Sequence, residues 1–266
     1  MTAVPIGVDV NDLRLPLKEA LRLAAGLEFR TIELPAGVNE VTPSALSSSG
    51  RRHLSRFVDG LGLSVAALSA DMPDLRLTDP RSVDERVERT RQIIDLARDL
   101  RVTVVTASVG ALTHPDSGEP SPLATEALRR IGEHADARGV VYAVRPSYDN
   151  GDRLARVLSE LRCPSIRVGL DPAAMVMRGV NPLAVIERLG DQIALLHARD
   201  ATVGFADRPG RETPLGQGEV DLRGVLLALD AADYHGAYIV RRTDSRNPTA
   251  DLQADRDALR RMLPQD

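Results

Sequence analysis

The chain has 266 residues, of which 43% are hydrophobic and 27% are charged, and its formal net charge at pH 7 is −4. This composition is that of an ordinary globular protein, and the chain is long enough to bury a sizeable core. The slightly acidic balance gives no general reason to expect nucleic acid or an anionic membrane as a partner.

Cysteine usage and hydropathy narrow the class of protein further. Cys163 is the only cysteine, which excludes an intramolecular disulfide and a metal site made of several cysteines. No stretch approaches the roughly 18 consecutive apolar residues of a membrane span. Residues 1–5 lead into the first predicted strand without the basic and apolar regions of a signal peptide. We therefore expect a cytoplasmic protein with no membrane partner.

Short runs rich in valine, isoleucine and leucine alternate with helical patterns along the whole chain. Such runs are typical of parallel strands that are covered on both faces. The predicted strands span residues 6–10, 30–34, 63–69, 102–108, 140–145, 166–171, 193–198 and 237–241.

The segments between these strands have the spacing of amphipathic helices. In residues 17–24 and 83–97, apolar side chains recur every three or four positions. Gly139 predicts the end of a helix, because glycine readily adopts the left-handed conformation found there. Helix starts are predicted where a capping side chain precedes a proline, at Asp79-Pro80, Ser121-Pro122 and Asn181-Pro182.

Eight strands alternating with about eight helices predict an α/β fold, a (β/α)8 TIM barrel, with residues 1–266 as a single domain. A doubly wound open sheet is the structural alternative. The polar stretches 109–121 and 199–219 are expected to be loops at the mouth of the barrel, where this fold carries function.

Four polar side chains stand at the carboxyl ends of the later strands. They are Arg145, Asp171, His197 and Arg241. Since the ends of parallel strands meet at one mouth, we expect these side chains to lie together. A Glu, Asp, His, Glu set there would indicate a divalent metal. A guanidinium has no lone pair to offer a metal, so the Arg, Asp, His, Arg set does not.

The second half of the chain contains three short motifs whose order and spacing are informative. They are Gly169-Leu170-Asp171-Pro172, Leu196-His197-Ala198-Arg199-Asp200 and Leu215-Gly216-Gln217-Gly218-Glu219-Val220-Asp221. In order and spacing they resemble motifs of the sugar phosphate isomerase/epimerase family, the xylose isomerase-like TIM barrels. The resemblance implies proton transfer beside a carbonyl, with one divalent ion held by Glu, Asp, His and Glu.

The chain departs from this family pattern at three positions. The resemblance places the two glutamates at Arg145 and Arg241, and a further histidine at Ala174. Asp171 and His197 alone are too few ligands for a convincing hard-cation site. We therefore expect no metal and no other cofactor, with Mn²⁺ or Mg²⁺ as the disfavoured alternative. Whether Asp9, Glu33 or Asp149 could rebuild a metal site stays open.

Each candidate residue has an expected role. The predicted catalytic residues are His197, Asp171 and Glu33. Arg145 and Arg241 are expected to pair with Asp171 and to hold a carboxylate or phosphate. The predicted substrate-binding set is Arg145, Arg241, Arg208, Arg211 and Asp200. The alternative for Arg145 and Arg241 is a pair of structural salt bridges in a barrel that has lost its chemistry.

The function indicated is that of a sugar phosphate isomerase/epimerase-like protein acting on a small sugar, polyol or keto-acid without the usual metal. The alternative is a catalytically inactive protein that binds an anionic, sugar-like ligand. Abasic-site endonucleases share this fold, but the acidic balance and five scattered histidines argue against them and against nucleic acid as a partner. A homo-oligomer is compatible with the sequence, which indicates neither the substrate nor the stereochemistry.

Overall fold

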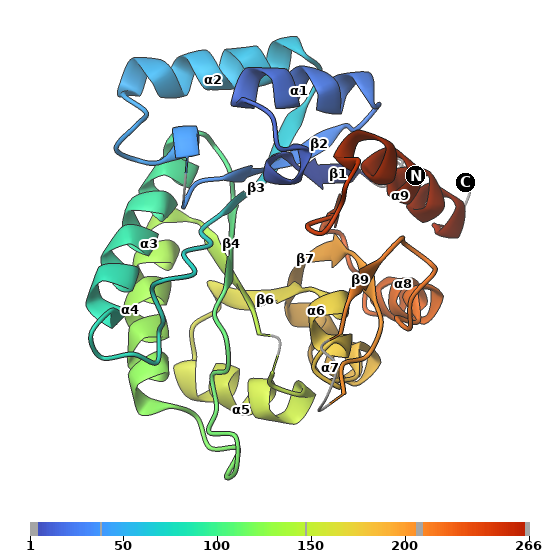
Figure 1. The fold of residues 1–266 in the computed structure, drawn as a ribbon. Coiled ribbons are helices and arrows are strands. Elements are labelled where there is room, and N and C mark those ends of the chain that lie inside the picture. Colours follow the sequence, from blue (N-terminus) through green and yellow to red (C-terminus); the bar gives the residue numbers. More distant parts are fainter. Residues whose placement is uncertain (1–4, 38, 147, 206–209, 264–266) are drawn as a thin grey trace.

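The computed structural model describes residues 5–37, 39–146, 148–205 and 210–263. Within them, eight parallel strands close into a barrel in the order β1-β10-β7-β6-β5-β4-β3-β2 (Figure 1). These strands are β1 Ile6–Asp9, β2 Thr31–Pro35, β3 Ser64–Ser69, β4 Val104–Ser108, β5 Val141–Arg145, β6 Ile166–Leu170, β7 Ile193–Ala198 and β10 Ala237–Val240. The predicted TIM barrel is confirmed, and every predicted strand agrees within two residues at each end.

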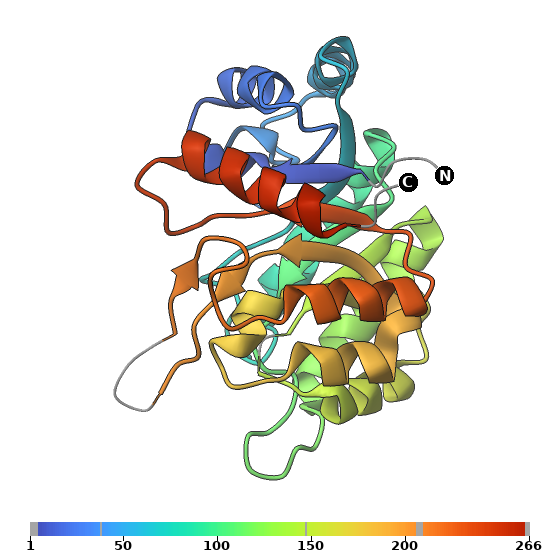
Figure 2. The ribbon, with the colours of Figure 1, turned by 90° about the vertical axis from the view of Figure 1, so that its right-hand side faces the viewer.

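Helices form the outer layer around the strands (Figures 1 and 2). They are α1 Leu17–Gly26, α2 Ser48–Gly60, α3 Val83–Asp99, α4 Pro122–Arg138, α5 Gly151–Leu161, α6 Pro172–Val176, α7 Pro182–Leu189, α8 Leu222–Ala231 and α9 Pro248–Met262. Their apolar stripes face inward; in α1, for example, Ala20, Leu21 and Ala24 are buried. No helix in the described ranges is both long and apolar enough to span a membrane.

Most of the predicted helix ends are correct. Ser121 caps α4 by accepting a hydrogen bond from the backbone N–H of Ala124, and Asn181 caps α7 in the same way. Gly139 ends α4 with a φ of 65°. The start predicted at Asp79-Pro80 is wrong, because residues 79–82 form a turn and α3 begins at Val83.

The stretch 199–219 has more structure than the predicted loop. Two short strands, β8 Asp200–Ala201 and β9 Glu212–Thr213, pair in antiparallel fashion and form a ribbon beyond the end of β7. Three single 3-10 turns, Val10–Leu13, Asn39–Val41 and Gly190–Gln192, complete the described elements. The ribbon and the first of these turns both supply acidic side chains to the barrel mouth.

Candidate functional site at the barrel mouth

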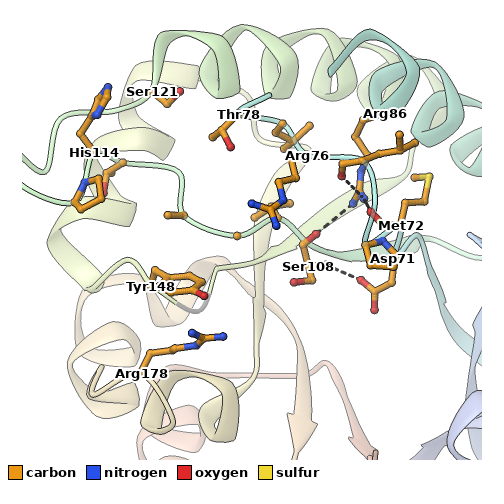
Figure 3. A pocket seen from close by; sticks show the side chains of 18 residues that line it. Asp71, Met72, Arg76, Thr78, Arg86, Ser108, His114, Ser121, Tyr148 and Arg178 are labelled. Carbon is orange, nitrogen blue, oxygen red and sulfur yellow. Dashed lines mark hydrogen bonds between the residues drawn. The ribbon is translucent and has the colours of Figure 1, made fainter. Parts of the chain in front are cut away.

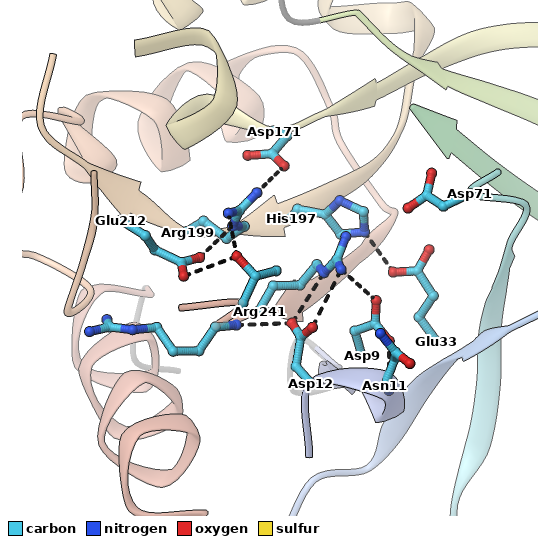
Figure 4. Close-up of polar contacts among 12 residues, drawn as sticks. Asp9, Asn11, Asp12, Glu33, Asp71, Asp171, His197, Arg199, Glu212 and Arg241 are labelled. Atoms are coloured by element: carbon cyan, nitrogen blue, oxygen red, sulfur yellow. Dashed lines mark hydrogen bonds and ion pairs between the residues drawn. The ribbon is translucent and has the colours of Figure 1, made fainter. Parts of the chain in front are cut away.

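The four polar residues predicted at strand ends lie on four consecutive strands of the closed barrel. Arg145 ends β5, Asp171 follows β6, His197 lies in β7, and Arg241 follows β10. Arg199 after β7 and acidic side chains from β1, the 3-10 turn Val10–Leu13, β2, the loop after β3 and β9 complete the group, most of which is visible in Figure 4. We call these ionisable residues the strand-end cluster. It comprises Asp9, Asp12, Glu33, Asp71, Arg145, Asp171, His197, Arg199, Glu212 and Arg241.

Arg145 is buried between a carboxylate and an imidazole. Its guanidinium forms an ion pair with Asp71 and donates from Nη1 to Nδ1 of His197 at 3.3 Å. Gly169 on the neighbouring strand makes room for it, since a Cβ there would lie 2.8 Å from Cγ of Arg145. The absence of a side chain at position 169 therefore lets Arg145 cross β6.

His197 uses both ring nitrogens in hydrogen bonds. A guanidinium can only donate, so Nδ1, which faces Arg145, must be unprotonated. Nε2 then carries the proton and donates to Glu33 at 2.6 Å. Burial lowers the pKa of His197 and the charge of Arg145 lowers it further, while Glu33 opposes them. The ring is therefore neutral near pH 7 and has no free lone pair with which to accept a proton.

Glu33 is fully buried and ionised. One carboxylate oxygen accepts from His197, and the other accepts from the hydroxyl of Thr106. Burial alone would raise its pKa, but the interaction with His197 and the charges of Arg145 and Arg241 lower it to about 2.

Arg241 is held by acidic groups from the beginning of the chain. Its guanidinium lies 3.0 Å from a carboxyl oxygen of Asp9 and forms an ion pair with Asp12 at 3.3 Å. Burial raises the pKa of Asp9 to about 8 against the lowering effect of Arg241, and the charges of Asp12 and Glu33 add to the rise. Asp9 therefore carries a proton at neutral pH.

Asp171 does not form the ion pairs expected with Arg145 and Arg241. Its partner is Arg199, at 2.7 Å, which also pairs with Glu212 of the ribbon at 2.8 Å. The other oxygen of Asp171 accepts from the backbone N–H of Ala174 at the start of α6. Burial raises the pKa of Asp171, but Arg199, His197 and this hydrogen bond outweigh it and lower the pKa to about 2. Asp171 pairs with Arg199 because Arg199 lies two residues after His197 and its side chain reaches Asp171.

The other predicted substrate-binding residues lie elsewhere. Asp200 is buried and accepts hydrogen bonds from three backbone N–H groups of the loop after β9, those of Gly216, Gly218 and Val220. This places Asp200 in the support of that loop. Arg211 is exposed beside the ribbon, and Arg208 lies outside the described residues.

The residues present do not fit a divalent ion at the family's usual position. Arg145 and Arg241 offer only donors, and both oxygens of Asp171 and both nitrogens of His197 already have partners. Asp149 does not rebuild the site, because it is buried and accepts from Leu112 and Thr113. Across the described ranges, no three His, Cys, Asp or Glu residues are arranged to hold a metal.

A cavity of about 920 Å³ opens beside the cluster, between the loops that follow β3 and β4 (Figure 3). Asp71 belongs to both, because it lines the cavity and forms the ion pair with Arg145. Its side chain is 35% exposed, whereas that of Arg145 is 6% exposed. Asp71 is therefore the point at which a molecule in the cavity meets the cluster. Asp71 is not among the predicted site residues, although it stands two residues beyond a predicted strand.

Comparison with known proteins identifies the class. The family model described as xylose isomerase-like TIM barrel matches residues 21–262, and the chain belongs to this family. A curated relative from Escherichia coli (strain K12), named "Putative L-ribulose-5-phosphate 3-epimerase SgbU", is 27% identical over 246 residues, which cover 86% of this chain and 84% of the relative.

Solved structures show the same fold at low sequence identity. A xylose isomerase domain protein from Planctomyces limnophilus superposes with a TM-score of 0.83 at 20% identity, covering 96% of this chain and 95% of that one. An L-ribulose 3-epimerase superposes with a TM-score of 0.76 at 19% identity, covering 97% and 94%. The barrel is thus conserved in shape among proteins whose sequences have diverged widely.

Proposed function

We propose that this chain is a sugar isomerase/epimerase-like protein that binds a small sugar-like ligand at the barrel mouth without the family's usual divalent ion. Membership of the family and the name of the E. coli relative support the sugar-like ligand. The observation that carries the proposal is the position of Arg145, whose fixed positive charge lies between Asp71 and His197 where the family pattern has a glutamate.

A permanent cation beside a carbonyl group stabilises the negative charge that develops when a neighbouring carbon loses its proton. Arg145 provides such a cation, and its pairing with the half-buried Asp71 connects it to the cavity. Asp71 accepts from the backbone N–H of Ser108 as well, at 2.7 Å. Burial would raise its pKa, but Arg145 and Arg241 hold the pKa well below the ordinary value. Asp71 is thus an ionised carboxylate within reach of a bound ligand.

A second candidate function is binding without turnover. Its support is that the three residues predicted to be catalytic, Asp171, His197 and Glu33, have their proton-accepting atoms engaged in hydrogen bonds. Proton transfer by any of them would require one of these contacts to break first. In this candidate the cluster is a structural and recognition element.

Hydrogen exchange distinguishes the two candidates. The protein would be incubated in D₂O with L-ribulose 5-phosphate and with L-ribulose, and the C3–H signal would be followed by ¹H NMR. Loss of the signal supports isomerase or epimerase chemistry, and Asp71→Asn should abolish it if Asp71 moves the proton. Ligand binding by calorimetry without exchange supports the second candidate. If neither sugar binds nor exchanges, the sugar-like ligand is wrong for both.

The metal-free part of the proposal has its own test. The purified protein would be examined by elemental analysis and by titration with Mn²⁺ and Mg²⁺. We expect no stoichiometric divalent metal in the protein and no saturable binding in the titration. Near-stoichiometric metal would overturn the view that arginine charges replace the ion.

A further inference from the structure

The cavity beside Asp71 has a surplus of positive charge. Three arginines line it, Arg76, Arg86 and Arg178, and its carboxylate, Asp71, is already paired with Arg145. Within the described residues, no carboxylate lies within ion-pair distance of any of these three arginines. Among the effects that shift the pKa of Asp79, the charge of Arg76 is the smallest, and the ion-pair partner of Asp79 is Arg81. A cavity with unmatched guanidinium groups attracts anions.

Arg86 contributes a buried charge to this surplus. It is 1% exposed and donates only to backbone carbonyls, those of Met72 at 2.9 Å and of Leu75 and Ser108 at 3.3 Å each. Its Nε is buried and has no hydrogen-bond partner in the described part of the chain. Carbonyl dipoles solvate the guanidinium but do not cancel its charge, so the wall of the cavity keeps a positive potential.

Arg76 and Arg178 present accessible donors from two different loops. Arg178 stacks on the ring of Tyr148, with the guanidinium carbon 4.3 Å from the ring centroid. Figure 3 shows Arg76 and Arg178 entering the cavity from opposite walls, with Asp71 farther along it. The stacking holds Arg178 in place, which lowers the entropy lost when it binds an anion.

We propose that this cavity is an anion subsite that takes the phosphate group of a phosphorylated sugar, with Arg76 and Arg178 as direct ligands. The carbonyl and hydroxyl end of the same sugar then lies toward Asp71 and Arg145. A volume of about 920 Å³ lies within the range of small-molecule sites. The orientation of the sugar rests on the proposed function, whereas the binding of phosphate does not.

Three titrations by calorimetry at constant ionic strength test the subsite, with inorganic phosphate, L-ribulose 5-phosphate and L-ribulose. The variants are Arg76→Gln and Arg178→Gln, and the matched control is Arg81→Gln, because Arg81 is 88% exposed and does not line the cavity. Each variant should weaken binding of phosphate and of L-ribulose 5-phosphate roughly tenfold, the loss expected for one charge-assisted hydrogen bond. Binding of L-ribulose and all binding by the control should be unchanged.

Several outcomes would overturn the subsite. These are equal affinity for L-ribulose with and without its phosphate, an equal loss in Arg81→Gln, or acetate competing as well as phosphate, which would indicate a carboxylate site. The two proposals fail separately. Phosphate binding that depends on Arg76 and Arg178, in a protein that binds no sugar, retains the subsite and rejects the proposed function. Sugar binding or hydrogen exchange without any preference for the phosphorylated sugar retains the proposed function and rejects the subsite.

Discussion

Nη1 of Arg145 lies 3.3 Å from Nδ1 of His197, and this contact determines where the proton of the imidazole resides. With Nδ1 as the acceptor, Nε2 must donate to Glu33. A residue that would be a metal ligand in the family pattern is thus fixed as a neutral hydrogen-bond bridge between a cation and an anion.

The tautomer of His197 is directly measurable. Long-range ¹H–¹⁵N NMR at pH 7 should show one protonated nitrogen, Nε2, and one unprotonated nitrogen, Nδ1. Arg145→Gln removes a charge that lowers the pKa of His197, so that pKa should rise. A doubly protonated ring in the unsubstituted protein at pH 7 would contradict the assigned bridge.

Asp9 should make the protein less stable as the pH rises. Its pKa is about 8 in the folded protein, above the ordinary value of 3.8. Between these values the folded state holds a proton that the unfolded chain has released, so stability falls as pH increases. Asp9→Asn removes this loss, which is at most about 1.4 kcal/mol per pH unit.

Urea unfolding at pH 6 and pH 8 measures the effect of Asp9. The difference between the two midpoints should be smaller for Asp9→Asn than for the unsubstituted protein. Asp152→Asn is the control, because the side chain of Asp152 is 91% exposed and should leave the difference unchanged. An equal pH dependence in Asp9→Asn would show that Asp9 is ionised at neutral pH.

Gly169 is predicted to be required for the course of Arg145. Gly169→Ala would place a methyl group 2.8 Å from Cγ of Arg145, and overpacking of this kind costs about 1–3 kcal/mol. Gly26→Ala in α1 is the matched control, since a Cβ there meets nothing within 4 Å. Its free energy of unfolding should be unchanged or slightly higher. Equal unfolding energies for the two variants would mean that Arg145 moves aside at little cost.

The double variant Arg145→Glu, Arg241→Glu tests whether the strand ends can still form the metal site of the family pattern, with Asp171 and His197 as the other two ligands. It removes two cations from buried carboxylates, so we expect it to be markedly destabilised without metal, because breaking a buried pair costs about 3–5 kcal/mol. Excess Mn²⁺ should raise its melting temperature and leave that of the unsubstituted protein unchanged. A double variant that folds and does not respond to Mn²⁺ would show that these four positions no longer form the family's site.

The sequence predicted which residues lie at the barrel mouth better than it predicted the ion pairs between them. Strand ends follow from short apolar runs, so the sequence alone places Arg145 and His197 at one mouth. The ion pairs could not be predicted, because they depend on the direction of long side chains and on loop paths. Asp71 meets Arg145 across a separation of 74 residues. In the sequence, Arg199 is a residue between His197 and Asp200 of the second motif. Nothing in its spacing indicated that it would form an ion pair with Asp171.

The residues that line the cavity could not be predicted either, because they also depend on loop paths and side-chain directions. Its two accessible arginines, Arg76 and Arg178, come from loops of irregular structure, where no periodicity indicates which way a side chain points. The aromatic ring of Tyr148 under Arg178 comes from yet another loop. Three such segments converge only once the barrel has closed.

The ion pair between Arg241 and Asp12 joins residues that are 229 positions apart. A further 229 residues must therefore be translated after Asp12 before it can meet Arg241, and β1 lacks its neighbour β10 for the same period. Docking of β10 brings Arg241 to the carboxyl groups of Asp9 and Asp12. The nascent protein thus acquires its closed barrel and the contacts of Arg241 at its mouth together.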